Sequence, residues 1–407
     1  MAGTIEQNTR PQARASAIAV DDMAQATRAL VQPYAVRLAA EVDELFIAGE
    51  SHPATVPMLR GSGLAGLTIP RRHGGQGMDY TAMATAAETL CAIDGAHQIA
   101  FTVHMALTSM AILHWGTAEQ HTRWLPPLAS GTELGTFGLT EPGVGSDVGN
   151  LAMRARRVDG GWLLNGEKSW ISAATYSTVF LLFATVDPAA RHKGITAFIV
   201  PRETPGLTTT TLHGKLGLRA GDTGSVFCTD AFVPDDDVLG NVSEGFVVAL
   251  ATLGNGLFTV GAGALGIATE TRSILIERLR ELGVTDLGAD ADELAAMTAR
   301  IEAGRVLLER ATALKNAGHP NGRETGLAKW QCANAGYENA GAAIRVLQGY
   351  EATEHLALQR HQANARGAII FGGTNEIHQG MQGSYALDYR RDRPFRLPTP
   401  TAADLTS

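Results

Sequence analysis

Apolar residues recur along the 407-residue chain with two different periods, and the change of period divides it into segments. From residue 21 to residue 134 the period is helical, and Asp21 or Asp22 is placed to cap the first helix. The apolar positions of that helix share one face: Leu38, Val42, Leu45 and Phe46. A glycine-rich connection follows at residues 72–79. Residues 1–20 are polar, and we expect a loose N-terminal tail.

Between residues 135 and 237 short apolar runs with turns between them predict strands. The dipeptides Asp159-Gly160 and Asn165-Gly166 each predict a tight hairpin, because both residue pairs suit hairpin turns. Further runs lie at 179–184, 196–201 and 226–228. We expect an antiparallel β-domain. No strand leads into a GxGxxG motif and a helix, so a nicotinamide site of that kind is not supported.

From residue 238 to residue 390 the helical period returns. A core stripe is expected from Met297, Ile301, Gly304 and Leu308. Residues 245–269 carry no charge and would be long enough to span a bilayer, but they contain several glycines and lack flanking anchors. We therefore expect a helix buried within a bundle. Residues 391–407 are basic and then proline-rich, which suggests a surface tail.

Composition narrows the possible functions. The net charge is −8 and the positive residues are dispersed, so nucleic acid is not an expected partner. The three cysteines are far apart, without a CxxC motif or a histidine cluster, so neither a metal site nor a disulfide framework is expected. A reducing, cytoplasmic location is the default. Helices, then strands, then helices predict an α+β multidomain protein.

Residues 137–147 form the most informative segment, reading FGLTEPGVGSD. Its glycines allow backbone N–H groups to approach a ligand, and the hydroxyls of Thr140 and Ser146 are available as donors. A second segment, residues 164–172, is expected to place Trp170 and Ser172 on one strand face, where an indole can pack on a planar ring. Taken singly, each segment is also compatible with a purely structural role, as a polar loop or as a core tryptophan beside a solvated serine.

Together the two segments resemble the TEPxxGSD and NGxKxWI[ST] signatures of the acyl-CoA dehydrogenase family. Residues 74–80, 116–131, 215–219 and 371–377 also resemble family motifs, in the same order. The resemblance implies an N-terminal helical domain (21–134), a central β-barrel domain with a flavin site (135–237) and a C-terminal four-helix bundle (238–390). It also implies a homo-oligomer, dimer or tetramer.

The resemblance further implies FAD as cofactor and an acyl thioester of CoA or acyl carrier protein as substrate. Ser146 would also face the substrate's pantetheine arm. By position in the motifs, the residues expected to bind FAD are Phe137, Leu139, Thr140, Gly145, Ser146, Trp170, Ile171, Ser172, Thr374 and Glu376.

The sequence departs from the family where the chemistry needs a base. The carboxylate that removes the α-proton stands in most members at the position of Gly372, and in a minority at that of Gly256. An Asp and an Arg that help to hold CoA are replaced by Gly254 and Leu257. The segments that reach a neighbouring subunit's FAD are altered, with the second reduced to residues 348–350.

Three functions stay open on these grounds. The first is dehydrogenation of a thioester with a base at a new position, with an electron-transfer flavoprotein or O₂ as electron acceptor. The second is a flavin-dependent monooxygenase, which needs no α-carbon base. The third is a base-less FAD-binding subunit of a hetero-oligomer.

Overall fold

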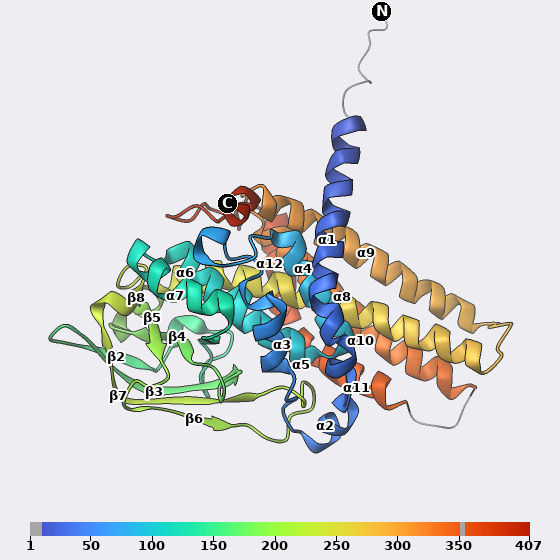
Figure 1. Cartoon of the computed structure of the whole chain (residues 1–407), viewed down its shortest axis with the longest axis horizontal. Coiled ribbons are helices and arrows are strands. Elements are labelled where there is room, and N and C mark those ends of the chain that lie inside the picture. Colours follow the sequence, from blue (N-terminus) through green and yellow to red (C-terminus); the bar gives the residue numbers. More distant parts are fainter. Residues whose placement is uncertain (1–9, 351–354) are drawn as a thin grey trace, which may run out of the picture.

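A computed structural model describes the backbone of residues 10–350 and 355–407 (Figure 1). The helical N-terminal region comprises α1 (Arg10–Ala39), α2 (Val42–Ala48), α3 (Thr55–Ser62), α4 (Tyr80–Ile93), α5 (Gly95–Phe101), a π-helical turn (Thr102–Ser109), α6 (Met110–Trp115) and α7 (Ala118–Ser130). Short 3₁₀ turns at Leu64–Gly66 and Arg71–His73 join α3 to α4, in agreement with the expected connection there.

The start of α1 corrects two expectations. The helix begins at Arg10, so residues 10–20 are not a loose tail, and it runs through Asp21 and Asp22 rather than being capped there. The residues ahead of Asp21 are polar but rich in alanine, the strongest helix former, which polarity alone did not reveal. Residues 1–9 of the expected tail lie outside the described part of the chain.

The central domain is an eight-stranded sheet with strand order β6-β7-β3-β2-β4-β5-β8, and β1 pairs with β4. The strands are β1 (Gly135–Gly138), β2 (Arg154–Val158), β3 (Gly161–Ser172), β4 (Val179–Thr185), β5 (Ile195–Pro201), β6 (Leu207–Thr211), β7 (Thr223–Pro234) and β8 (Val238–Leu239). Two features differ from the expected antiparallel barrel. The pairs β1–β4 and β2–β4 are parallel, and the path of paired strands is open, with β6 and β8 at its ends.

One of the two predicted hairpins is confirmed and the other is wrong. Asp159-Gly160 joins β2 to β3, with Val158 paired to Gly161. Asn165-Gly166 instead lies inside β3, at an irregularity in its pairing with β7. There the side-chain amide of Asn165 donates to the carboxylate of Asp230 in β7 and accepts from its backbone N–H, both at 2.9 Å. The polar side chain that would stabilise a turn therefore bonds to the neighbouring strand instead.

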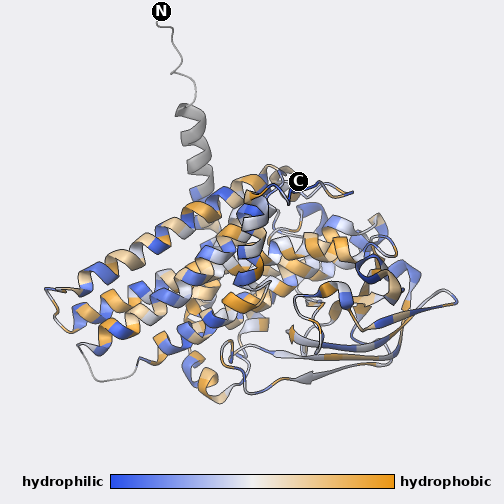
Figure 2. Ribbon diagram, turned by 180° about the vertical axis from the view of Figure 1, so that it is seen from behind, coloured by the Kyte–Doolittle hydropathy of each residue, from blue (hydrophilic) through white to orange (hydrophobic). Residues whose placement is uncertain are grey.

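The C-terminal region contains α8 (Gly245–Glu281), α9 (Asp290–Asn316), α10 (Gly322–Gln348), α11 (Leu356–Ile370), α12 (Asn375–Ala386) and α13 (Ala402–Thr406). Polar and apolar bands alternate along the long bundle helices (Figure 2). The four residues of the predicted stripe, Met297 to Leu308, are all buried. By length and composition alone Gly95–Trp115 and Gly245–Glu281 could each cross a membrane, but 94% and 61% of their apolar windows are buried inside the protein. This agrees with the expectation of a bundle-buried helix for α8.

The expected surface tail after residue 390 is also corrected, because this segment packs back on the protein. Arg396 bonds both carboxylate oxygens of Glu244, at 2.7 and 2.8 Å. The Tyr80 hydroxyl donates to the carbonyl of Pro400 at 3.1 Å, and Leu405 is buried. Phe395 adds ring contacts with His114 and Trp115, at 6.2 and 6.1 Å between centroids.

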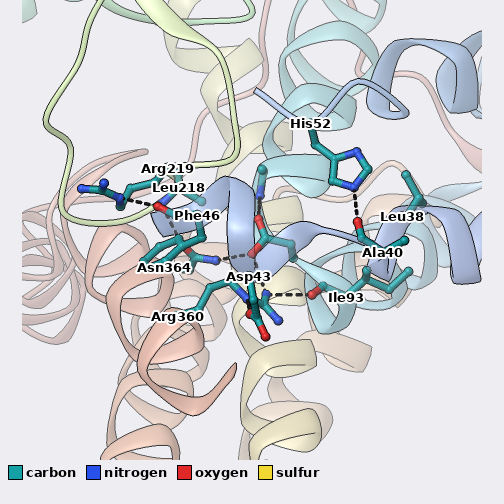
Figure 3. A network of polar contacts seen from close by, with 12 residues as sticks. Leu38, Ala40, Asp43, Phe46, His52, Ile93, Leu218, Arg219, Arg360 and Asn364 are labelled. Carbon is teal, nitrogen blue, oxygen red and sulfur yellow. Dashed lines mark hydrogen bonds and ion pairs between the residues drawn. The ribbon is translucent and has the colours of Figure 1, made fainter. Parts of the chain in front are cut away.

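A buried polar network joins all three regions (Figure 3). Arg360 of α11 donates to Asp94, the N-cap of α5, at 2.7 Å and to Asp43 of α2 at 2.6 Å. Asn364, one turn later, donates to Asp94 at 2.8 Å and accepts from the backbone N–H of Leu218, between β6 and β7, at 2.6 Å. Burial alone would raise the pKa of Asp94, but the Arg360 and His97 charges and the hydrogen bonds lower it below its ordinary value. The carboxylate is therefore held ionised at the junction.

We expect Arg360→Leu to lower the free energy of unfolding by about 3–5 kcal/mol, because it leaves the Asp94 charge buried without its partner. Urea unfolding followed by circular dichroism measures the loss. The control is Arg157→Leu, which removes an ion pair to Asp235 that is exposed on both sides and should change the urea midpoint little. Equal, small shifts in both variants would show that the network does not hold the domains together.

Candidate functional site

The two signature segments of the β-domain lie side by side. The backbone N–H of Ser169 donates to the carbonyl of Thr140 at 2.9 Å. Three residues further along β3, the Thr136 hydroxyl donates to the carbonyl of Ser172 at 2.6 Å. The loop after β1 therefore runs along the end of β3, and the residues predicted from the two motifs meet in one place.

A buried ion pair supports this loop from the interior. Lys168 donates to Glu141 at 2.7 Å and to the carbonyl of Leu139 at 3.2 Å. Glu141 also accepts from the backbone N–H groups of Ala152 and Met153, at 2.6 and 2.9 Å. Burial lowers the pKa of Lys168 to about 8, with the charge of Glu141 opposing the shift. Neither residue was predicted as functional, although both lie inside the motifs. Two oppositely charged residues, one in each motif, could have indicated an ion pair between the two segments.

Trp170 presents a large apolar side chain to solvent. Its side chain is 60% exposed, whereas Ile171 is buried and Ser172 half-buried. The backbone at Trp170 has φ of 60°, at a point where the pairing of β3 with β7 shifts register. A strand irregularity of this kind re-aims a side chain, and left-handed backbone at a non-glycine residue is unfavourable unless its surroundings impose it. The predicted hairpin here is wrong, but the exposed tryptophan with a nearby hydroxyl is present.

The other predicted β-domain residues divide into buried and accessible ones. Phe137 and Leu139 are buried, and the Phe137 ring packs 5.0 Å from that of Phe183. Thr140 is half-buried, and an added Cβ at Gly145 would meet no atom within 4 Å. The buried residues thus form the base of the loop, and the accessible ones face outward.

A cavity of about 580 Å³ opens beside this loop. Ser146 and Asp147 line it from the β-domain, and Phe246 and Leu250 line it from the first turns of α8. On the remaining side His192 lies in the 3₁₀ segment Pro188–Gly194, with its ring 5.3 Å from that of Phe246. The cavity combines an apolar wall with polar and cationic edges, and Ser146 stands at its border with the loop.

The third signature, residues 371–377, forms the turn before α12. Gly372 and Gly373 have φ of 66° and 85°, values that favour glycine. Thr374 caps α12 by accepting from the N–H of Ile377 at 3.3 Å, and Glu376 is exposed in the first turn. A glycine turn leading into a helix N-terminus suits an anionic group. The polar contacts of Thr374 and Glu376 are local, so their place in a common site with the β-domain residues stays a prediction.

No carboxylate stands at either expected base position. A Cβ built on Gly372 would lie 3.5 Å from Leu257 and 3.8 Å from Val260, both apolar residues of α8. Two titratable groups lie against the carbonyls of this turn: Lys329 donates to the carbonyl of Gly373 at 2.8 Å, and a ring nitrogen of His378 lies 3.4 Å from the carbonyl of Gly372. Neither residue was predicted from the sequence, since a single lysine or histidine on a helix carries no distinguishing pattern.

The two glycines of α8 have different surroundings. A Cβ on Gly256 would lie 2.8 Å from the side chain of Leu107, so the absence of a side chain there permits close packing. A Cβ on Gly254 would meet nothing within 4 Å. Removal of side chains therefore serves packing at Gly256 and leaves open space at Gly254.

The sequence matches family models over most of its length. The N-terminal, middle and C-terminal domains of acyl-CoA dehydrogenases match residues 20–132, 136–231 and 243–384, respectively. The chain belongs to the acyl-CoA dehydrogenase family. It is 35% identical to the human mitochondrial short-chain specific acyl-CoA dehydrogenase over 360 residues, which cover 86% of this chain and 85% of that protein.

Solved structures of family members have the same fold. Butyryl-CoA dehydrogenase from Megasphaera elsdenii superposes with a TM-score of 0.85 at 29% identity, covering 90% of this chain and 98% of that one. A glutaryl-CoA dehydrogenase from Mycobacterium smegmatis in complex with FADH2 has a TM-score of 0.83 at 28% identity, covering 91% and 95%. The fold predicted from the resemblance is therefore confirmed as that of the acyl-CoA dehydrogenases.

The residues present fit a flavin of the kind that this mycobacterial relative holds. An exposed indole offers a flat apolar face, while the hydroxyls of Thr140 and Ser172 lie in neighbouring segments joined by hydrogen bonds. The open space at Gly145 admits a ligand close to the backbone. The surface thus has the mixture of flat apolar area and polar donors that a flavin ring requires.

We expect Gly254→Ala and Gly256→Ala to change stability in opposite directions. Alanine at residue 254 meets open space and removes a helix-interior glycine, which should stabilise α8 by about 1 kcal/mol. Alanine at residue 256 forces Leu107 to move and should destabilise the protein. Thermal unfolding of the two variants provides the comparison, and a gain in both would contradict the packing assigned to Gly256.

Proposed function

We propose that this protein is an FAD-dependent oxidoreductase that introduces an α,β double bond into an acyl thioester of CoA or acyl carrier protein. The observation that supports it best is that exposed Trp170 lies at the end of a strand held by hydrogen bonds to the loop after β1. The same loop leads to Ser146 at the 580 Å³ cavity between the β-domain and α8. A flat apolar surface for the flavin ring and an open, partly apolar cavity reached by the same loop suit oxidation of an acyl chain. Membership of the family supports the reaction class.

The residues of the chain would contribute binding and orientation. Trp170 would cover one face of the flavin, with the buried Ile171 supporting the strand beside it and Thr140 and Ser172 donating hydrogen bonds to the polar edge of the ring. Ser146 would donate to the thioester arm within the cavity, where Phe246 and Leu250 exclude water. FAD, when bound, accepts the hydride that leaves the β-carbon.

The base is the part in which this protein differs from its family. Removal of the α-proton needs an acceptor, and Gly372 and Gly256 provide none. We infer that a group outside these two positions takes the proton. The same absence favours two alternatives: a monooxygenase, which needs no α-carbon base, and a base-less FAD-binding subunit that works with a competent partner chain.

The proposed partners follow from the reaction. Electrons would leave the reduced flavin to an electron-transfer flavoprotein or to O₂. Large apolar side chains stay exposed at the cavity and at α11 and α12, including Leu250 at 45%, Ile370 at 55% and Ile377 at 44%, which supports a homo-oligomer. We place this protein in the cytoplasm.

A panel of thioesters separates the three functions. Purified yellow protein is mixed anaerobically with acyl-CoA compounds and with the same acyl groups on a carrier protein. Bleaching of the flavin indicates dehydrogenation, and the responsive series identifies the carrier. If no thioester bleaches the flavin, but reduced enzyme consumes O₂ while hydroxylating an added substrate, the monooxygenase is correct. A colourless protein that turns yellow only with a co-purified chain would indicate the subunit.

We expect the double variant Trp170→Ala, Thr140→Val to lose most of its flavin, because it removes the proposed stacking surface and a hydrogen-bonding hydroxyl. Folding should be affected little, since the indole is 60% exposed. Absorbance near ~450 nm, a property of the flavin itself, measures occupancy, and circular dichroism is the control for folding. Full flavin occupancy in a folded variant would show that Trp170 and Thr140 do not form the flavin-binding surface.

We expect Gly372→Glu to create or raise dehydrogenation of simple acyl-CoA compounds. A positioned general base contributes about 100- to 10,000-fold, and the Cβ has room, although the left-handed backbone at residue 372 costs about 1–2 kcal/mol. Gly372→Gln is the matched control, because it has the same shape but cannot take the proton. Equal rates in the two variants would show that the missing carboxylate is not what limits the reaction.

A further inference from the structure

The turn at Gly372 is held from behind by one buried lysine. Lys329 of α10 donates to the carbonyl of Gly373 at 2.8 Å and to the side-chain oxygen of Asn375 at 3.1 Å. Its own Cα would lie only 3.1 Å from a Cβ on Gly261 of α8, so the backbones of α10 and α8 approach closely there. The lysine therefore reaches the turn from a fixed position in the bundle.

The charge of Lys329 is not neutralised by an ion pair. Lys329 is fully buried, and among the described residues no carboxylate lies within 4.0 Å of its ammonium group. In contrast, the buried Lys168 of the β-domain has Glu141 at 2.7 Å. Burying a cation without an ion pair is unfavourable, so the two oxygen acceptors at the turn are its principal compensation. The hydrogen bond to Gly373 should therefore contribute more to the stability of the turn than an ordinary surface hydrogen bond does.

The turn itself depends on such contacts. Gly372 and Gly373 are both in left-handed backbone, and glycine there leaves the chain free to take other conformations. Besides Lys329, the ring of His378 lies 3.4 Å from the carbonyl of Gly372, and Asn375 donates to Asn334 of α10 at 2.8 Å. The ammonium group is the charged member of this set and its strongest donor.

We propose that Lys329 is a positioning residue that fixes the turn from Gly372 to Thr374 in the conformation that binds FAD, and that its positive charge favours the anionic cofactor at this end of the site. The effect of the Lys329 charge on FAD rests on the proposed function. The effect of Lys329 on the conformation of the turn concerns the chain alone and is testable without FAD.

The groups around Lys329 define how this contact should depend on pH. Burial lowers the pKa of Lys329 to about 7, with the charge of Glu376 opposing the shift. Burial also lowers the pKa of His378 to about 4, so that ring is neutral near pH 7. The pKa of Glu376 lies below its ordinary value, so that carboxylate stays ionised, and α8 faces Lys329 with the backbone of Gly261. As the pH rises through 7, the ammonium charge is lost and the hold on the turn weakens.

The first measurement is amide hydrogen exchange in the apoprotein. Lys329→Met keeps the length of the side chain but cannot donate, and it should raise exchange at least about tenfold across residues 371–378, the size expected for a lost charged hydrogen bond. Lys315→Met is the matched control: Lys315 is another buried lysine, donating to Asn255 at 2.9 Å, and its pKa is also lowered to about 7 by burial. This variant should leave exchange of the turn unchanged. Unaltered exchange of the turn in Lys329→Met would overturn the inference.

The second measurement is FAD affinity of the apoprotein between pH 6 and pH 8.5, by flavin fluorescence. The unmodified protein and Lys315→Met should bind about tenfold more weakly at the higher pH. Lys329→Met should bind weakly at both, and Lys329→Arg, which stays charged, should bind with little pH dependence. A pH response retained in Lys329→Met would overturn the role of the charge. No FAD binding by the unmodified protein would overturn the proposed function, while the exchange result would still decide the role of Lys329 at the turn.

Discussion

The arrangement of the three domains depends on the buried pair between Asp94 and Arg360. Asp94 begins α5, Arg360 belongs to α11, and the neighbouring Asn364 carries the contact on to Leu218 of the β-domain. Both carboxylate oxygens of Asp94 accept hydrogen bonds, one from the backbone of Ala96 and the other from Arg360 and Asn364, which is the condition under which a buried carboxylate is tolerated. The cavity beside Ser146 lies between the β-domain and α8, so its shape depends on the relative position of these domains.

At three places in the protein, a lysine stabilises an irregular backbone segment by donating hydrogen bonds to main-chain carbonyls. Lys168 holds the loop after β1 through Leu139, Lys329 holds the turn before α12 through Gly373, and Lys215 holds the segment before β7 through Leu218 at 2.9 Å. Each loop is rich in glycine and would be mobile by itself. A flexible side chain with three donors can satisfy several carbonyls of a non-repeating backbone, which helices and strands cannot do.

The sequence predicted those features that depend on local pattern. The helical and strand regions, the Asp159-Gly160 hairpin and the buried stripe around Ile301 follow from period and turn chemistry. The errors arose where distant residues decide the outcome. Asn165-Gly166 has the composition of a turn, but β7 pairs alongside it and keeps it in a strand.

The candidate site shows the same limit. The motif residues Trp170 and Thr140 could be named from their pattern, since their segments resemble two family motifs. Lys329 could not be named, because its importance comes from a carbonyl 44 positions away in the chain. Burial without an ion pair is a property of the folded protein, and no local window of sequence contains it.

The packing of residues 396–405 against the N-terminal helices has a consequence for biosynthesis. Tyr80 and Pro400, which share a hydrogen bond, are 320 positions apart, and Leu405 belongs to the same apolar core as Leu64 and Tyr80. The helices around Leu64 and Tyr80 therefore cannot complete their packing until residues 396–405 have been translated. Until then part of their apolar surface stays uncovered, and surface of this kind is prone to aggregation during synthesis.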